Sequence, residues 1–489
     1  MAYDQAADAV YTPRYKPRAK QTEALAKCGN RAAFAYRMRP RVGKTKTTLD
    51  DFGQLELAGK CQDLAVIGPN GALFPWLEDI DAHLSDDLHR RVKILRWRSG
   101  AGPGFKQQLK AFLEHRDGPR IFLMNVEALS SVKAARVAMS LFLGPRRAML
   151  AVDEATCIKT PGAARTKFVL DNLAPQAEYR RILSGLLTPK SPLDLFAPYW
   201  FLDWRIIGQR SYYAFRNRYA VMREEFFGGR RIKIVVGFRN LEELAAKVEP
   251  HSFYCALSDC YDAPAKIYLE HEVELTAEQR RIYDELKTWA TAHLGNQQFV
   301  TANVVIAQIM RLHQVLCGHV RDEEGNYHEV PESRTTALVE LFEEHDPEKA
   351  IVWVSYDADI RRVSAALRKT FNVESVAQFW GGNPRTREAE ELRFKTDPRC
   401  RFMVATAQAG GRGREWSVAD LVVYYSNTDN LEFREQSEDR PQAVGKTRPV
   451  TYVDLMVPGT VDEKIIKALR AKINLAAVID GEERRNWLI

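Results

Sequence analysis

The stretch AMLAVDEAT, residues 148–156, decides the fold, because a run of apolar residues leads directly into two adjacent acids, Asp153 and Glu154. A short apolar run of this kind is typical of a strand buried on both faces in a parallel sheet. Side chains that follow such strands gather at the carboxyl edge of the sheet, where ligands bind. The two acids are therefore expected at a ligand site. The competing interpretation is a solvated acidic turn.

Similar apolar runs lie on both sides of this stretch, and helical patterns separate them. The alternation predicts β-α units and an α/β lobe in the first 200 residues, and a second series of such units begins near residue 350. The expected strands are LAVIGP (64–69), IFLMN (121–125), YRRILSG (179–185), AIVWVSY (350–356), RFMVATA (401–407), LVVYYS (421–426) and VTYVDLMV (450–457). Expected helices include KTKTTLDDFGQLELAG (44–59), GFKQQLKAFLEHR (104–116), SYYAFRNRYAVM (211–222) and LEELAAKV (241–248), while GGRRIKIVVGF (228–238) resembles a hairpin or exposed strand.

The bulk composition sets broad limits on function. A length of 489 residues allows two or three domains, and the net charge of +7 gives only weak support for a polyanionic partner. Seven scattered cysteines without a CxxC pair indicate neither a disulfide framework nor a zinc ribbon, so a reducing compartment is expected. There is no apolar run of the roughly 20 residues that span a bilayer. The sequence thus predicts a soluble cytoplasmic protein with no membrane partner.

RVGKTKTT (41–48) lies where a phosphate-binding loop is expected, immediately before an amphipathic helix. Gly43 would let the backbone amides of Arg41, Val42 and Gly43 approach phosphate oxygens. The Lys44 ammonium can neutralise phosphate charge, and the Thr45 hydroxyl can ligate magnesium. The pattern is incomplete, since a full GxxxxGK[ST] motif would have glycine at position 38, and its spacing alone is compatible with a chance GKT.

The loop and the acidic pair together predict an ATP site. Asp153 is expected to hold Mg²⁺ together with Thr45, and Glu154 to polarise the water that attacks the γ-phosphoryl group. Lys44, Asp153 and Glu154 are therefore candidate catalytic residues, with ATP and Mg²⁺ as cofactors.

The order of motifs resembles helicase superfamily two, and in particular its Swi/Snf-type translocase branch, from about residue 14 to 475. In the first half, the resemblance rests on YKPRAKQTEAL (15–25), VIGPNGALFPWLEDI (66–80) with Trp76 at the family's tryptophan, NVEAL (125–129), DEATCIKTPGAARTK (153–167) and PLDLFAPYWFLD (192–203). In the second half, it rests on VELTAEQRRIYDEL (273–286), MRLHQVLCGH (310–319), IVWVSY (351–356), ATAQAGGRGREWSVADLVVYYSN (405–427) and QSEDRPQAVGKTRPVTYVDLMVPGTVDEKII (436–466).

This resemblance implies an α/β fold with two RecA-like lobes, each a parallel sheet flanked by helices, and helical insertions between them. Residues 1–205 are expected to form the first, ATP-binding lobe and residues 206–275 a helical or connecting insertion. Residues 276–489 are expected to form the second lobe, with a helical start over 276–345.

The resemblance also implies roles for single residues. Gln21 would read adenine, Gly411, Gly413 and Gln436 would complete the ATP site, and Arg440 would act as an arginine finger. The implied DNA contacts are Asn70, Gly71, Asn125, Lys159, Thr160 and Thr406.

Several positions depart from the family pattern. Arg41 replaces a glycine of the phosphate loop, and Leu186 and Leu187 alter the LTGTP motif. Ala443 stands where the family has its second arginine. An arginine finger contributes about three to five orders of magnitude in rate, so hydrolysis is expected to be slow unless another cation compensates. The candidates for compensation are Arg440, Arg412, Arg414, Lys446 and Arg41.

The function expected from the sequence is an ATP-dependent DNA translocase or helicase, a DNA-dependent ATPase acting on duplex or branched DNA in replication, recombination or repair. DNA contacts are expected to be mostly to the backbone and independent of sequence, and other replication or recombination proteins are possible partners. The compact form resembles phage and bacterial versions, which places it in the bacterial cytoplasm or that of a phage-infected host. Two alternatives stay open: a strand-separating DNA or RNA helicase, and a weakly hydrolysing nucleotide-gated DNA clamp or partner subunit.

Overall fold

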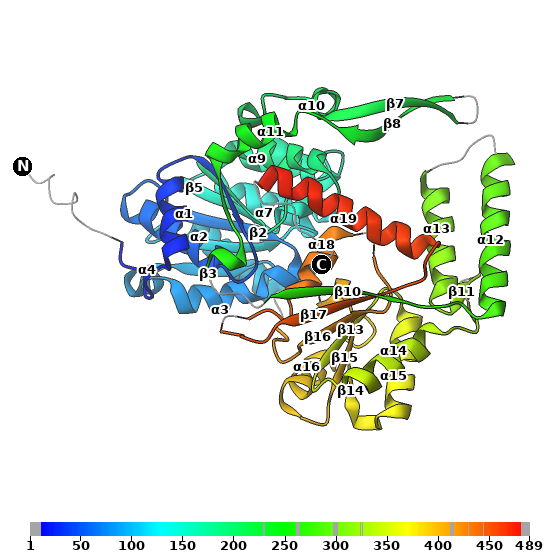
Figure 1. Cartoon of the computed structure of the whole chain (residues 1–489). Coiled ribbons are helices and arrows are strands. Elements are labelled where there is room, and N and C mark those ends of the chain that lie inside the picture. The colour runs from blue at the N-terminus through cyan, green and yellow to red at the C-terminus, as the bar shows by residue number, and fades with distance from the viewer. Residues whose placement is uncertain are drawn as a thin grey trace, which may run out of the picture. The chain divides into compact units, whose positions relative to one another are not determined.

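The computed structural model describes residues 11–227, 230–260, 265–296, 302–322, 324, 326–410, 415–428, 430–443 and 445–480. The described residues fall into two compact units (Figure 1). The first unit holds 11–221, 237–260 and 475–480, and the second holds 265–474 with most of 222–236. None of the described helices combines the length and apolar character needed to cross a membrane.

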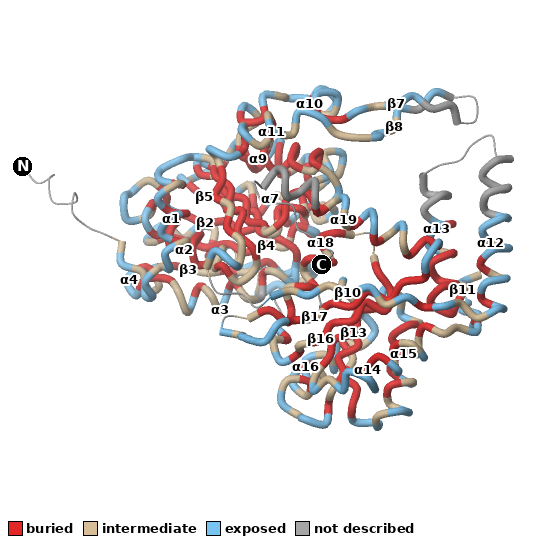
Figure 2. The backbone as a smooth tube through the Cα atoms, in the orientation of Figure 1, coloured by how far each residue is buried: buried red, intermediate tan, exposed pale blue. Residues whose placement is uncertain are grey.

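A parallel sheet forms the centre of the first unit, with the strand order β3-β4-β2-β5-β6-β1-β9 among the described residues. Its strands are β1 (Ala33–Met38), β2 (Asp63–Gly68), β3 (Lys93–Arg96), β4 (Arg120–Asn125), β5 (Ala148–Asp153), β6 (Tyr179–Leu183) and β9 (Ser252–Cys255). The central strands β2 and β5 are buried at every residue, as the red segments in Figure 2 show. Because all strands run the same way, the segments that follow them share one edge of the sheet.

Helices cover the faces of this sheet. On one face, Leu49 and Phe52 from α2 and Trp76 and Ile80 from α3 share a core with the strands. The helices are α1 (Ala19–Cys28), α2 (Lys44–Leu57), α3 (Phe74–His83), α4 (Asp86–Arg91), α5 (Pro103–Glu114), α6 (Ala128–Ser131), α7 (Lys133–Leu143), α8 (Ala164–Phe168), α9 (Phe196–Ile207), α10 (Tyr212–Tyr219) and α11 (Leu241–Val248). Single turns lie at η1 (Asn70–Ala72), η2 (Ala155–Ile158), η3 (Val169–Leu173), η4 (Ala174–Gln176), η5 (Pro192–Leu195), η6 (Glu249–His251) and η7 (Leu257–Asp259).

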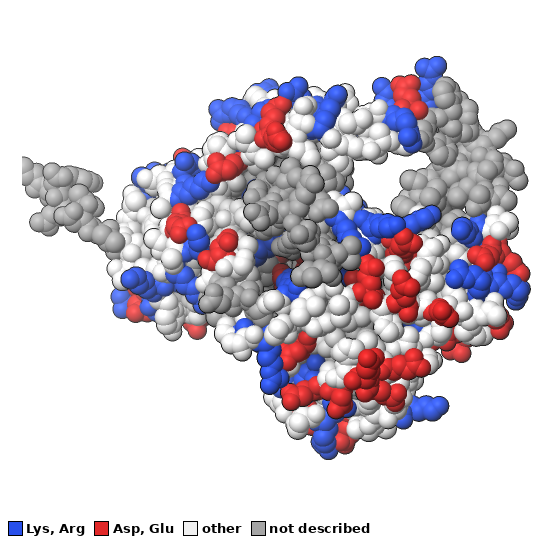
Figure 3. Space-filling model, in the orientation of Figure 1, with Lys and Arg blue, Asp and Glu red and all other residues white. Residues whose placement is uncertain are grey.

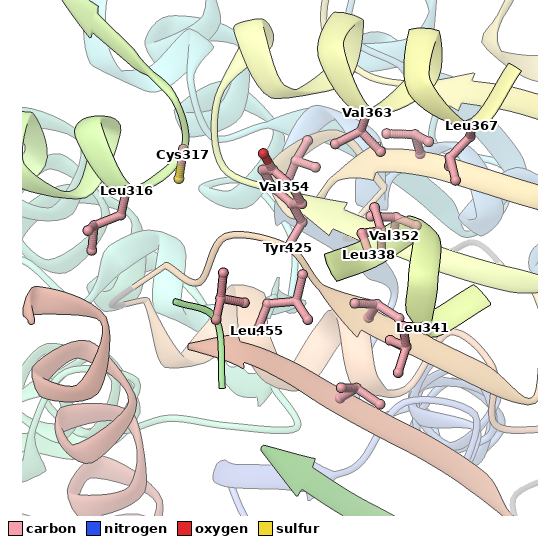
Figure 4. Packing of buried hydrophobic residues seen from close by; sticks show 14 of the residues in the cluster. Leu316, Cys317, Leu338, Leu341, Val352, Val354, Val363, Leu367, Tyr425 and Leu455 are labelled. Carbon is pink, nitrogen blue, oxygen red and sulfur yellow. The ribbon is translucent and has the colours of Figure 1, made fainter. Parts of the chain in front are cut away.

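The second unit contains another parallel sheet, with the described strands in the order β10-β17-β16-β13-β15-β14. They are β10 (Lys266–Glu272), β13 (Ala350–Val354), β14 (Val376–Phe379), β15 (Phe402–Thr406), β16 (Leu421–Tyr424) and β17 (Val450–Met456). Figure 4 shows Val352 of the sheet meeting Leu338 from α14 and Val363 and Leu367 from α15 in the core.

The remaining elements of the second unit are mostly helical. They are α12 (Ala277–Asn296), α13 (Ala302–Leu316), α14 (Arg334–His345), α15 (Asp357–Thr370), α16 (Arg387–Thr396), α17 (Ala407–Gly410), α18 (Leu431–Glu438) and η8 (Val373–Ser375), with the hairpin β11 (His319–Arg321) and β12 (Tyr327–Glu329). The last helix, α19 (Val461–Asp480), begins in the second unit, and its residues from 475 on belong to the first. Two parallel sheets flanked by helices confirm the predicted α/β fold of two RecA-like lobes.

The stretch 206–275, expected to connect the lobes, contributes to both sheets. Its β9 is the edge strand beside β1, and its β10 pairs with β17. Between α10 and α11, β7 (Ala220–Phe227) and β8 (Arg230–Phe238) form a two-stranded sheet. The helical prediction for 211–222 was therefore wrong at its end, because residues 220–222 begin β7. Edge strands escape prediction because half-exposed residues interrupt their apolar pattern, as in β3 and β10.

Candidate functional site

The loop between β1 and α2 turns sharply and contains two residues with positive φ. Arg41 has φ 69° and Gly43 φ 98°, both in the left-handed region. A Cβ on Gly43 would lie 2.1 Å from Nε2 of Gln21, so only glycine fits at this position. At Arg41, where the resemblance implies glycine, the left-handed backbone conformation costs about 1–2 kcal/mol because the residue has a Cβ. The loop thus holds Arg41 and Gly43 both in the left-handed region.

Gln21 on α1 braces this loop. Its Nε2 donates to the Val42 carbonyl at 3.0 Å, and its Oε1 accepts the Arg18 backbone N–H at 3.0 Å. The side chain is only 3% exposed. Gln21 therefore ties α1 to the phosphate loop, and its expected contact with adenine stays a prediction.

The start of α2 is fixed by side chains that bond back to the loop. Lys44 Nζ donates to the Met38 carbonyl at 3.1 Å, across the loop from the end of β1. The Thr47 and Thr48 hydroxyls donate to the carbonyls of Gly43 and Lys44 at 3.0 and 2.9 Å. The first N–H groups of a helix lack intrahelical partners and favour anions, so this end of α2 suits a phosphate group.

Asp153 lies at the end of β5 and is held by two donors. Nε1 of Trp76 donates to Oδ2 at 2.9 Å, and the Glu154 backbone N–H donates to Oδ1 at 2.9 Å. Glu154 itself is in the left-handed region, with φ 48° and ψ 63°. Non-glycine residues in this region cost free energy and cluster at functional sites. The two acids predicted from the sequence are therefore pre-oriented at the sheet edge.

Helix α3 brings a further carboxylate, Asp79, to this place. The Thr45 side chain at the start of α2 lies close enough to Asp79 to lower the pKa of its carboxyl group. Burial raises the pKa of Asp79, with a contribution from the charge of Asp153, while His83 and Thr45 act in the opposite direction. Thr45 and Asp153, the two predicted magnesium ligands, thus both contact α3, through Asp79 and Trp76. Asp79 was not predicted from the sequence, although it follows Trp76 by three residues and so shares its helix face.

A buried ionic cluster fixes α2 on the sheet behind the loop. Arg181 of β6 donates through Nε to Oδ2 of Asp51 at 2.6 Å, and the Tyr36 hydroxyl donates to the same oxygen at 2.8 Å. Nearby, Lys46 and Asp50 pair at 2.5 Å, and burial raises the pKa of Asp50 to about 6. Breaking a buried pair by removing one partner costs about 3–5 kcal/mol. This cluster therefore holds the lysine-bearing helix in register with the sheet.

The altered LSGLLTP segment follows β6 and packs against the phosphate loop. A Cβ on Gly185 would lie 3.0 Å from Cδ of Pro40, which leaves little room for any other residue. Leu186 and Leu187 are buried, and the Ser184 hydroxyl donates to the Leu186 carbonyl at 2.7 Å. The departure from the family's LTGTP motif thus substitutes apolar packing while keeping the glycine where close approach requires it.

The predicted DNA contacts of the first unit follow three neighbouring strands. Asn70 and Gly71 lie in η1 after β2, and Asn125 ends β4, paired with Gly68. Asn70 accepts Arg96 Nη2 at 2.9 Å, and Asn125 donates to Glu127 Oε2 at 3.3 Å. Lys159 and Thr160 follow η2, beyond β5, and Thr160 is exposed. The sheet order places these candidates on the β4-β2-β5 side and the phosphate loop at β1.

In the second unit, a cavity of about 460 Å³ opens at the ends of the central strands. Thr406, a predicted DNA contact at the end of β15, lines it. Its lining includes the hydroxyl and charged residues Ser355, Asp357, Arg387, Ser426, Thr428 and Arg434. Gly411 and Gly413, predicted to bind ATP, lie outside the described residues.

Helix α18 and the turn after it hold the remaining predicted residues. Gln436 contacts Glu432 one turn earlier at 3.5 Å. Arg440 is 7% exposed, and its carbonyl accepts the Trp416 backbone N–H at 2.9 Å. The sequence analysis did not single out Arg434, which is buried and donates to Asp454 at 2.5 Å and to Glu438 at 2.9 Å. Arg434 therefore anchors the helix that carries Gln436.

Lys446 was one of the cations expected to compensate for Ala443, but its side chain binds other groups of the second unit. Its Nζ donates to the carbonyls of Ser417 at 2.9 Å and Ala419 at 2.6 Å, and pairs with Asp420 at 2.8 Å. Lys446 thus braces the segment before β16. Arg412 and Arg414, two other candidates, lie outside the described residues.

Comparisons with known proteins find similarity to helicases. The family model for the helicase conserved C-terminal domain matches residues 333–447. An uncharacterized ATP-dependent helicase of Mycoplasma genitalium is 21% identical over 214 residues, which cover 44% of this chain and 21% of that protein. Protein p41 of Acyrthosiphon pisum secondary endosymbiont phage 1 is 23% identical over 333 residues, covering 65% of this chain and 69% of the phage protein.

Among solved structures, the chain is similar to the Sulfolobus solfataricus SWI2/SNF2 ATPase core in complex with dsDNA. The alignment covers 96% of this chain and 94% of the Sulfolobus chain, with 20% sequence identity and a TM-score of 0.42. The chain spans only about a fifth of the length of the Mycoplasma relative. The second half of the chain thus carries a match to the helicase conserved C-terminal domain, and the chain is similar in sequence to helicase relatives.

Proposed function

We propose that the chain is a DNA-dependent ATPase that translocates on duplex or branched DNA. The observation that carries this proposal is the convergence of Thr45 and Asp153 on α3 in the first unit: Thr45 lies beside Asp79, and Trp76 donates to Asp153. A hydroxyl and a carboxylate beside a helix N-terminus are the groups that a magnesium nucleotide requires. Helicase relatives match the same chain.

The residues present fit Mg²⁺ and a nucleoside triphosphate. Gly43 lies where a side chain would collide with Gln21, and its φ of 98° also favours glycine in the loop. Thr45 and Asp153 would hold Mg²⁺, which neutralises phosphate charge when bound. Lys44 would exchange its bond to the Met38 carbonyl for a phosphate oxygen, and Glu154 would orient water and take its proton.

DNA binding is expected to rest on backbone contacts. Asn70, Gly71, Asn125 and Thr160 offer small polar groups in segments that follow β2, β4 and β5. Figure 3 shows that charge is unevenly spread: acidic side chains gather over α14, where Glu340, Glu343 and Glu344 are exposed. Such a surface disfavours DNA, so contacts are expected elsewhere. Binding through phosphates should be independent of sequence and should weaken steeply with salt.

The proposed role extends to replication, recombination or repair in a bacterial cytoplasm, with proteins of those processes as partners. The decisive experiment titrates ATP hydrolysis with single-stranded, duplex, forked and four-way DNA, with RNA as the comparison. Stimulation by duplex or branched DNA is expected, and Lys44→Ala and Glu154→Gln should abolish it. Lys106→Ala, an exposed change on α5, is the control. Phosphate release by the wild type no higher than that of the two site variants would exclude an ATPase motor.

A second candidate is a nucleotide-gated DNA clamp that hydrolyses ATP weakly. It is favoured by Ala443 at the position of the family's arginine and by the bonds that hold Lys446 in place. A clamp would bind DNA more tightly with nucleotide yet show no DNA-stimulated turnover. A strand-separating helicase differs again, because it would unwind a forked duplex, whereas a pure translocase displaces a triplex strand without unwinding.

A further inference from the structure

Two cysteines of the first unit lie close enough to react with each other. Cys255 is the last residue of β9, and Cys260 follows the single turn η7, so the segment reads CALSDC. Their Sγ atoms are 3.4 Å apart, and both are free thiols. A disulfide bond measures about 2.05 Å, so closure requires a shift of roughly 1.4 Å between the sulfurs. Cys255 is buried, whereas Cys260 is partly exposed.

The intervening turn holds the two thiols together. The Asp259 carboxylate accepts the Ala256 backbone N–H at 2.7 Å, and the Cys260 N–H donates to the Leu257 carbonyl at 3.1 Å. The backbone is therefore already folded back at the place where the ring would close. Pre-organisation of this kind raises the effective concentration of one thiol at the other.

We propose that Cys255 and Cys260 form a reversible dithiol–disulfide site. The oxidant is a low-molecular-weight disulfide such as oxidised glutathione. The Cys260 thiolate attacks one sulfur of the oxidant, which releases one glutathione thiolate and leaves a mixed disulfide. The Cys255 thiolate then attacks Sγ of Cys260, forms the internal bond and releases the second glutathione. The two cysteines lose two protons and two electrons, and the oxidant becomes two glutathione molecules.

Exposure sets the order of these steps. Cys260 reacts first because solvent reaches it, while burial raises the pKa of the Cys255 thiol and protects it from external oxidants. Cys255 becomes reactive only against the sulfur already beside it. An intramolecular bond is therefore favoured over two mixed disulfides.

The site is joined to the phosphate loop, and this part of the inference rests on the proposed function. The Arg39 backbone N–H donates to the Cys255 carbonyl at 2.9 Å. Met38 and Val42 share one core cluster with Cys255, and Cys260 packs against it. A shift of the sulfurs is thus transmitted to both ends of the loop that would hold the nucleotide phosphates.

The test treats the full-length protein with oxidised glutathione and counts thiols after denaturation. The wild type should fall from seven thiols toward five, and the peptide spanning 255–260 should lose two hydrogen atoms in mass, reversibly with dithiothreitol. Cys260→Ser should prevent this loss. Cys157→Ser, at another partly exposed cysteine, should leave it intact. A 255–260 peptide that stays reduced, or that carries a persistent glutathione on Cys260, would overturn the proposal.

A second measurement compares nucleotide affinity of the reduced and oxidised protein. The wild type should show a change in Kd of about fivefold or more, and Cys260→Ser none. Equal Kd values with the disulfide present would overturn the link to the loop. Absence of any nucleotide binding would instead contradict the proposed function, while the thiol count and peptide mass still decide the disulfide.

Discussion

Nε1 of Trp76 donates a 2.9 Å hydrogen bond to Oδ2 of Asp153, joining α3 to the end of β5. Trp76 is 1% exposed, so water does not compete for this bond. Asp153 is the predicted magnesium ligand, and the indole leaves its second oxygen, Oδ1, with the backbone N–H of Glu154. A group that hydrogen-bonds a metal ligand from behind fixes its orientation, and removing it typically lowers metal affinity or activity by about 10- to 100-fold.

Trp76→Phe tests this orienting role, because it keeps an aromatic ring and removes the donor. We expect turnover and the apparent affinity for Mg²⁺ to fall by about 10- to 100-fold. Trp97→Phe is the matched control, since Trp97 is also buried and donates instead to Ser99 Oγ at 3.1 Å. ATPase assays across a range of Mg²⁺ concentrations measure the effect. Equal losses in both variants would reduce the role of Trp76 to packing.

Two substitutions of Arg41 distinguish the effect of backbone strain on stability from the effect of the side-chain charge. Arg41→Gly removes the conformational strain of a non-glycine residue in the left-handed region, which stabilises the folded state by about 1–2 kcal/mol. It also raises the conformational entropy of the unfolded chain, which lowers stability by about 0.4–1 kcal/mol. A modest net gain in the free energy of unfolding is expected. Arg41→Ala removes the same charge and keeps the strain, so it should give no such gain. Urea denaturation of both variants decides, and equal stabilities would contradict strain at φ 69°.

Ala443→Arg restores the arginine that the family has after Arg440. Because Lys446 is held by the carbonyls of Ser417 and Ala419, we expect the wild type to lack a full complement of fingers and the variant to turn over ATP at least about tenfold faster. Ala443→Met supplies similar bulk without charge and should not accelerate hydrolysis. Steady-state kcat with saturating duplex DNA is the measurement. A variant no faster than wild type would show that Arg440 suffices or that hydrolysis is limited elsewhere.

Asp359 in the second unit predicts a dependence of stability on pH. It is fully buried and accepts the Ser426 hydroxyl at 2.8 Å, and burial raises its pKa from 3.8 to about 7. Between these values the folded state binds more protons than the unfolded state, so the contribution of Asp359 to stability falls as pH rises from about 4 to 7, by at most about 1.4 kcal/mol per pH unit.

Asp359→Asn should therefore stabilise the protein relative to wild type increasingly across this window, and by a constant amount above it. Nδ1 of His319 lies 3.4 Å from Oδ1 of Asp359, and burial lowers the pKa of His319 from 6.5 to about 4. The contribution of His319 to stability therefore rises with pH between about pH 4 and 6.5, opposite to that of Asp359. The measurement is the difference in unfolding free energy between wild type and Asp359→Asn at pH 5 and at pH 8. Because both proteins contain His319, its contribution largely cancels in this difference. A difference in unfolding free energy that does not grow with pH would contradict the raised pKa.

The local pattern of residues determined most of the fold. AMLAVDEAT produced β5 and its acidic end, and the other apolar runs produced strands at nearly the expected residues, because strands buried on both faces are apolar throughout. GKT before an amphipathic helix likewise indicated the start of α2. The edge strands β9 and β10 were not predicted from local patterns. The pairing of β10 with β17 joins residues more than 180 apart in sequence, and the pairing of β1 with β9 joins residues more than 200 apart.

The tertiary structure alone decided which side chains meet. Nothing in the sequence spacing joins Trp76 to Asp153, Arg181 to Asp51 or Lys446 to Ser417, since each contact connects elements that only the sheet order brings together. Cys255 and Cys260 are close in sequence, but their sulfurs face each other only because η7 folds the chain back. Periodicity records the burial of one element at a time, whereas a site depends on distances between elements, which the packing of the whole unit sets.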